Sequence, residues 1–108
     1  MARNDLQGSL DLLVLKTLAQ RGKLHGNGIV QHIQTASDEL LQVEEGSIYP
    51  ALHRMEQSGW IEAEWAMTGT NRKAKYYELT ATGRRQLKEV EESFELLVKG
   101  VRAMLRYA

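Results

Sequence analysis

The chain has 108 residues, 14 basic and 14 acidic side chains, and no cysteine. This length suits one small domain and excludes a second, and the missing thiols exclude disulfides, thiolate metal sites and cysteine nucleophiles. Because the formal net charge is zero, attraction to nucleic acid or lipid must come from a local cluster and not from the whole molecule.

The first predicted helix covers residues 6–21. Apolar side chains recur at helical spacing over this stretch, beginning with Leu6, and Gly22 ends the helix. Asp11 and Lys16 are expected to turn outward. Since these two charges interrupt the apolar run, it is neither a secretory signal nor a membrane span, and we expect a cytoplasmic protein without membrane contact.

Two shorter helices are predicted next. The helical pattern repeats over residues 26–36 and breaks at 37–38. A linker then leads to a third helix over about residues 48–58, which Gly59 terminates.

The third helix is expected to begin at an N-cap formed by Ser47. This cap would leave Pro50 at the third helical position, where its missing N–H costs no intrahelical bond. Ile48, Leu52 and Met55 then face the core.

A β-hairpin follows the third helix. Over residues 61–67 the apolar period changes to two, which predicts a strand, and a second strand is expected over about residues 75–80. The turn formers of 68–73 join the strands into an antiparallel hairpin whose tip carries Arg72 and Lys73. The sequence thus concentrates basic charge at one place in a chain without net charge.

Thr80 is expected to cap a last helix that reaches almost to the C-terminus. Its apolar side chains alternate spacings of three and four, which is a heptad stripe. The stripe consists of Leu87, Val90, Phe94, Leu97, Val101 and Met104. A helix of about 25 residues is roughly 40 Å long, longer than the body of so small a domain. A second copy of the chain is therefore the expected partner of the stripe.

This order of elements predicts a mainly α fold with a small β-hairpin (α+β). Three short helices followed by a hairpin are typical of a winged helix-turn-helix, in which the third helix enters the major groove and the hairpin tip lies along the DNA backbone. We expect a winged helix-turn-helix DNA-binding domain over residues 1–80 and a dimerisation helix over 81–108, joined in a single structural unit.

Four segments of the chain resemble the PadR family of bacterial transcriptional regulators. They are 24–26 (LHG), 46–56 (GSIYPALHRME), 71–77 (NRKAKYY) and 79–83 (LTATG), and together they extend the resemblance over nearly the whole chain. The resemblance implies a homodimeric repressor that binds an inverted-repeat operator in double-stranded DNA and is released by a small aromatic effector. Asn27 departs from the family pattern, in which a tyrosine is usual.

The residues expected to contact DNA lie on the exposed face of the third helix and on the wing. They are Ser47, Tyr49, Pro50, His53, Arg54, Arg72, Lys73 and Lys75. Side chains of the helix can reach base edges or phosphates, whereas the wing cations are expected on phosphates alone. Lys75 has a second interpretation, because a lysine at the root of the strand can pair with a carboxylate instead.

Trp65 and the histidines also have competing interpretations. Trp65 either packs within the hairpin, the interpretation we favour, or offers a stacking surface to an aromatic effector at the dimer cleft. His25, His32 and Glu39 are set aside as metal ligands because no further pair has metal spacing, and His25 is expected to be a turn or cap residue. No cofactor or metal is expected.

An enzyme is not expected, because the sequence has no Ser/His/acid set, phosphate loop or clustered carboxylates in a plausible pocket. The alternative function is a winged helix that contacts only proteins, since the fold does not dictate DNA binding. The basic wing tip argues against this alternative.

Overall fold

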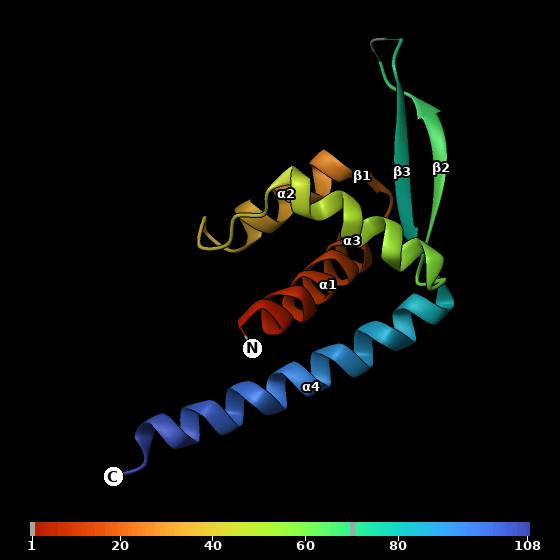
Figure 1. Ribbon diagram of the computed structural model, residues 1–108. Coiled ribbons are helices and arrows are strands. Elements are labelled where there is room, and N and C mark those ends of the chain that lie inside the picture. Colours follow the sequence, from red (N-terminus) through yellow and green to blue (C-terminus); the bar gives the residue numbers. More distant parts are fainter. Residues whose placement is uncertain (1, 70) are drawn as a thin grey trace.

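The computed structural model describes residues 2–69 and 71–108, with side chains from Ser9 onward. The elements in chain order are α1 (Ala2–Arg21), β1 (Leu24–His25), α2 (Gly26–Ala36), α3 (Glu45–Gln57), β2 (Ile61–Met67), β3 (Lys73–Leu79) and α4 (Ala81–Arg106). Three helices form a compact body, the β2–β3 hairpin stands up from one side of it, and α4 runs beneath it (Figure 1). The predicted mainly α, winged helix-turn-helix fold is confirmed.

The sheet has three strands in the order β1-β3-β2, all antiparallel. The sequence predicted β2 and β3 but not β1, because a strand of two residues is too short to show a period. β1 pairs Leu24 with Tyr77 and so ties the start of α2 to the root of the hairpin.

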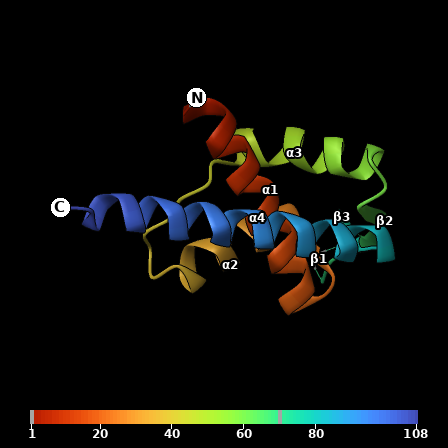
Figure 2. The same ribbon diagram turned by 90° about the horizontal axis from the view of Figure 1, so that it is seen from below.

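Helix α1 is the centre of the body. It lies between α3 and α4 and also packs against α2 and β3 (Figures 1 and 2). Val14, Leu15 and Leu18 are fully buried within it. The prediction that Asp11 turns outward is wrong, because its side chain is 14% exposed and pairs with Arg54 of a neighbouring helix. Lys16 stays 43% exposed, although it also meets an ionic partner on a neighbouring helix. The side chain of Leu6 lies outside the described residues.

The core also takes the inner faces of the other elements. Its buried apolar residues beyond α1 are Ile29, Ile33, Ile48, Ala51, Leu52, Met55, Ile61, Tyr77, Leu79 and Leu87. The predicted inward positions of the third helix are therefore confirmed.

The junction between α3 and β2 has the predicted glycine. Gly59 adopts a left-handed φ of 80° after the helix ends. The Gly59 N–H donates to the Glu56 carbonyl (3.0 Å), and the Trp60 N–H donates to the Met55 carbonyl (3.0 Å). These two bonds form a Schellman motif, in which a glycine adopts at little cost the conformation that other residues resist.

The start of α4 is packed closely onto the hairpin root. The Thr80 Oγ1 accepts from the Gly83 N–H at 3.0 Å, so the predicted cap is confirmed. A Cβ on Gly83 would lie 1.9 Å from the Trp60 carbonyl oxygen, so this approach requires glycine.

The rest of α4 leaves the body gradually. Leu87 is buried in the chain's own core, and Lys16 of α1 pairs with Glu91 at 3.2 Å. Beyond this pair α4 extends past the body (Figure 2), and the molecule is 60 Å long along its longest axis. In the described chain, no helix is both long and apolar enough to cross a membrane.

Candidate nucleic-acid interface

Helix α3 starts earlier than the sequence predicted. Its N-cap is Glu44, without a side-chain cap bond, and the Glu44 carbonyl already accepts from the Ile48 N–H at 3.1 Å. The prediction that Ser47 caps the helix is wrong. The first turn forms upstream of Ser47, where the acidic Glu45 suits the positive end of the helix dipole. Pro50 is therefore well inside the helix and cannot donate the bond that would reach the Gly46 carbonyl.

The solvent-facing side of α3 carries most of the predicted contact residues. Ser47, Tyr49, Pro50 and His53 are exposed, and Tyr49 retains 48% of its surface. Gln57 lies on the same exposed side. This face offers hydroxyl, imidazole and amide groups that can donate to or accept from base edges and phosphates.

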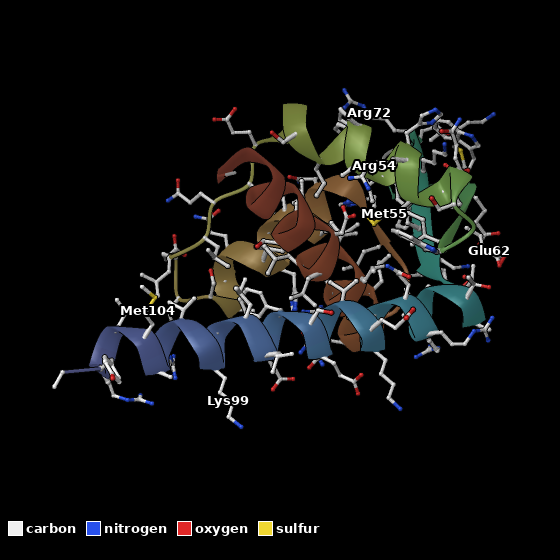
Figure 3. All side chains as sticks on the ribbon, turned by 60° about the horizontal axis from the view of Figure 1, so that its bottom comes forward. Arg54, Met55, Glu62, Arg72, Lys99 and Met104 are labelled. Carbon is white, nitrogen blue, oxygen red and sulfur yellow. The ribbon has the colours of Figure 1, made fainter. Side chains whose placement is uncertain are left out.

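Arg54 does not belong to that free face. Its Nη1 and Nη2 donate to the two carboxylate oxygens of Asp11 at 2.9 and 2.8 Å. This hydrogen bonding raises the pKa of Arg54, against the opposing effect of burial. Arg54, which was predicted to reach a guanine edge or a phosphate, instead directs its planar guanidinium to Asp11 and is 37% exposed; it is labelled next to Met55 in Figure 3.

Among the residues that the structure describes, neither cation of the hairpin tip has an ionic partner. Arg72 and Lys73 are exposed, and Arg72 closes the turn by accepting from the Thr68 N–H at 2.7 Å through its carbonyl. Lys73 was expected in the turn, but it is the first residue of β3 and pairs in register with Met67. Thr70, within the predicted turn, lies outside the described residues.

Lys75 follows the second of its two interpretations. Its Nζ lies 3.2 Å from the Glu56 carboxylate on α3 and 5.7 Å from the centre of the Tyr77 ring. Burial raises the pKa of Tyr77, and the charge of Lys75 opposes that rise. Lys75 thus links the wing to α3 with a satisfied charge.

The wing has two faces of different character. The register places Trp65 opposite Lys75 and Met67 opposite Lys73, on the face that continues from the buried pair Ile61–Leu79. We call this the inner face. The other face carries the like-charged pair Glu62 and Glu78 directly opposite one another, and Glu64, which pairs with Lys23. We call it the outer face; Glu62 is labelled in Figure 3.

A groove of about 540 Å³ lies between the inner face, α3 and the start of α2. Its aromatic and basic walls come from Tyr49, Trp65, Tyr77, Arg72, Lys73 and Lys75. The rest of the lining is His25, Gly26, Asn27, Thr68 and Ala74, so the residue that departs from the family pattern faces this groove. The charged residues that line the groove are all basic, and three aromatic residues line it with them.

The N-cap and the first residue of α2 fix one side of the groove. His25 is the N-cap, and its Nδ1 accepts from the Gly28 N–H at 2.9 Å, which confirms the predicted cap. A Cβ on Gly26 would lie 2.8 Å from Cε1 of Tyr49, so the absent side chain leaves room for the Tyr49 ring. Among the residues that the structure describes, no group of three His, Asp or Glu side chains could hold a metal ion.

The two tryptophans differ in their burial. Trp60 is partly buried and packs on the core, whereas Trp65 keeps 65% of its surface. The interpretation of Trp65 as hairpin packing is therefore not supported. The alternation pattern could not predict this exposure, because the inner face is buried only at the hairpin root.

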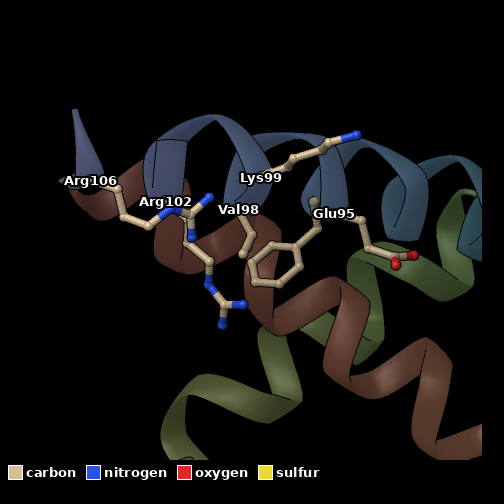
Figure 4. Close-up of a pocket in the computed structure, with 6 residues that line it drawn as sticks. Glu95, Val98, Lys99, Arg102 and Arg106 are labelled. Carbon is tan, nitrogen blue, oxygen red and sulfur yellow. The ribbon is translucent and has the colours of Figure 1, made fainter. Parts of the chain in front are cut away.

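The predicted stripe on α4 divides into two parts. Leu87 belongs to the chain's own core, because the first turns of α4 lie on α1. Further along, Phe94, Leu97, Val101 and Met104 are between 41% and 80% exposed. A hollow of about 380 Å³ lies beside this half of α4, where Val98 is flanked by charged side chains (Figure 4).

Comparison with known proteins gives consistent matches. The profile of the transcriptional regulator PadR-like family matches residues 14–89. A transcriptional regulator from Clostridium thermocellum is 26% identical, with a TM-score of 0.85 over 98% of this chain and 99% of that one. A PadR family transcriptional regulator from Eggerthella lenta is 31% identical, with a TM-score of 0.79 over 99% of this chain and 91% of that one. An uncharacterised protein of Lysinibacillus sphaericus is 28% identical over 109 residues, which is 94% of this chain and 99% of that protein.

Proposed function

The chain belongs to the PadR-like family of transcriptional regulators and is not an enzyme, and on this premise we propose that it represses transcription by binding an inverted-repeat DNA operator as a homodimer. The observation that carries the proposal is the groove in which Tyr49 of α3 faces the basic residues of the wing. A duplex needs both features, because polar groups read bases and cations hold phosphates. Binding to chromosomal DNA corresponds to the cytoplasmic location that we propose.

The contacts divide between the two elements. His53 is exposed in the middle of α3 and is proposed to hydrogen-bond a base edge. Tyr49 and Ser47, in the first turns, are proposed to reach a phosphate or a thymine methyl. Arg72 and Lys73 are proposed to neutralise phosphates. Arg54 and Lys75 are held by Asp11 and Glu56, and we assign them the placement of α3 relative to α1 and the wing.

Dimerisation is proposed through the exposed half of α4. A contiguous apolar stripe of this kind is rarely left to solvent, and a symmetric pair of helices buries it in both copies at once. The two copies of α3 would then meet successive major grooves about 34 Å apart, which predicts half-sites one helical turn apart.

The resemblance to the family also implies a small aromatic effector. Trp65, a candidate contact for it, lies in the groove proposed for DNA. An aromatic effector bound to this ring would therefore exclude the duplex by competition.

Selection of binding sites from random duplexes tests the proposed function. The wild type is expected to recover a two-fold symmetric site, and His53→Ala to blur matching positions in both halves, with a loss of about 1–3 kcal/mol at those positions. His32→Ala on α2, a helix to which no base contact is assigned, is the matched control. Recovery of no symmetric site by a folded wild type would support the alternative function, a winged helix that contacts only proteins.

Salt titration separates phosphate contacts from base contacts. Lys73→Ala is expected to weaken all duplexes alike and to lower the slope of log K against log salt by about 1. Lys88→Ala, an exposed lysine of α4, should leave the slope unchanged. An unchanged slope for Lys73→Ala would show that Lys73 of the wing does not contact a phosphate.

A further inference from the structure

Trp65 is an unusual residue to expose on the wing. It keeps 65% of its surface, although it lies on the inner face, where residues nearer the root are buried. Met67, two residues further along the same face, is 56% exposed, so the two side chains form a contiguous apolar surface of the kind that marks contact sites. We therefore expect a molecule that occupies the groove to cover the Trp65 indole.

The dimer helix does not supply that occupant. The wing tip points away from α4, and the exposed stripe of α4 extends from the opposite side of the body (Figure 1). A second copy that docks along α4 would leave the inner face of the wing open.

The surroundings of Trp65 fit a polyanion with an apolar component. Arg72 and Lys73 lie next to it along the wing and line the same groove. Its cross-strand partner Lys75 is already paired with Glu56. At this position along the wing, an aromatic ring therefore lies opposite a cation whose charge is neutralised. The other wall of the groove holds the exposed Tyr49 ring.

We infer that Trp65 packs its indole against the deoxyribose of the bound duplex, between the phosphates that the wing cations hold. This inference rests on the proposed function. In an intact duplex the base faces are covered by stacking, so a ring that approaches along the backbone meets the apolar C–H surface of the sugars. The contact adds affinity without neutralising charge, in contrast to that of Lys73.

The salt dependence of binding tests the inference. The probe is a labelled duplex carrying the selected site, and its affinity is measured by fluorescence anisotropy over a series of KCl concentrations. Trp65→Ala is expected to weaken binding about tenfold, the effect of losing roughly 55 Å² of buried apolar surface. The slope of log K against log salt for Trp65→Ala should equal that of the wild type, whereas the slope for Lys73→Ala should be smaller by about 1.

Tyr107→Ala is the matched control, because Tyr107 is an exposed aromatic residue at the end of α4, away from the groove. It should bind as the wild type does. A wild type that binds no duplex would refute the proposed function itself. If the wild type binds and Trp65→Ala binds equally well, only the contact of Trp65 is refuted. A smaller salt slope in Trp65→Ala would also refute that contact, because the ring would then act only by positioning the cations.

Tryptophan emission gives a second measurement that does not require a folded alanine variant. Addition of the duplex should change the emission of the wild type, and Trp65→Phe should abolish the change, because Trp60 packs on the core. Equal changes in both proteins, or none in the wild type, would overturn the inference.

Discussion

Arg54 of α3 and Asp11 of α1, separated by 43 residues, form a bidentate ion pair with N–O distances of 2.9 and 2.8 Å. The side chain of Asp11 is only 14% exposed and that of Arg54 is 37% exposed. The pair therefore fixes the orientation of the proposed recognition helix on the central helix of the body.

Asp11→Ala is expected to lower the free energy of unfolding by about 1–3 kcal/mol, between the values typical of exposed and of buried ion pairs. Urea denaturation measures the change. Glu92→Ala, an exposed carboxylate on α4, should stay within about 0.5 kcal/mol of the wild type. If the stability losses of Asp11→Ala and Arg54→Ala were additive in a double-mutant cycle, the two side chains would not be coupled. The role assigned to the pair would then be wrong.

Gly83 and Gly100 provide a matched pair in one helix. Gly83→Ala is expected to destabilise the fold by about 2 kcal/mol or more, because its Cβ would lie 1.9 Å from a backbone carbonyl oxygen that cannot move freely. Gly100 has open space around it, so Gly100→Ala should stabilise the protein by up to about 1 kcal/mol. Thermal unfolding of both variants checks this opposite response, and equal shifts would contradict the close packing at the hairpin root.

Phe94→Glu should convert the proposed homodimer into monomers, because it introduces a charge into the apolar stripe of α4. Leu96→Glu is the control, since Leu96 is 72% exposed two positions further along and so faces the other side of the helix. Sedimentation at micromolar concentration gives the mass. A wild type with the mass of a single chain would contradict the dimer directly.

Gly26→Ala should impair DNA binding more than stability. The added Cβ would meet the Tyr49 ring at 2.8 Å, and an exposed ring can rotate away at little energetic cost. We expect a stability loss below about 1 kcal/mol and weaker binding to the selected duplex. In a Tyr49→Ala background the same substitution should have no further effect on affinity. A loss of affinity as large as in the wild-type background would show that Gly26→Ala does not act through Tyr49.

Local signals in the sequence predicted most of the fold. Gly59 and Thr80 were identified correctly because a helix end depends on a few neighbouring residues. The same local reasoning misplaced the cap at Ser47, where an extended Glu44 allows the helix to start earlier.

The parts of the site that the sequence missed depend on distant partners. Asp11 resembles a solvated helix residue until the fold brings Arg54 to it across 43 positions. The exposure of Trp65 likewise depends on how far the hairpin projects beyond the core, which a period of two residues does not encode. The residues of the groove could be listed from the sequence, but their division into free and paired charges could not.

The opposite characters of the two wing faces have a consequence for how the molecule meets DNA. The chain has no net charge, so at long range a polyanion exerts almost no pull on it. At closer range the acidic outer face, with Glu62 opposite Glu78, is repelled while the inner face is attracted, and the result is a torque that turns the protein during approach. We therefore expect a collision through the outer face to be less favourable than one through the inner face, so that a regulator without net charge would be oriented at short range.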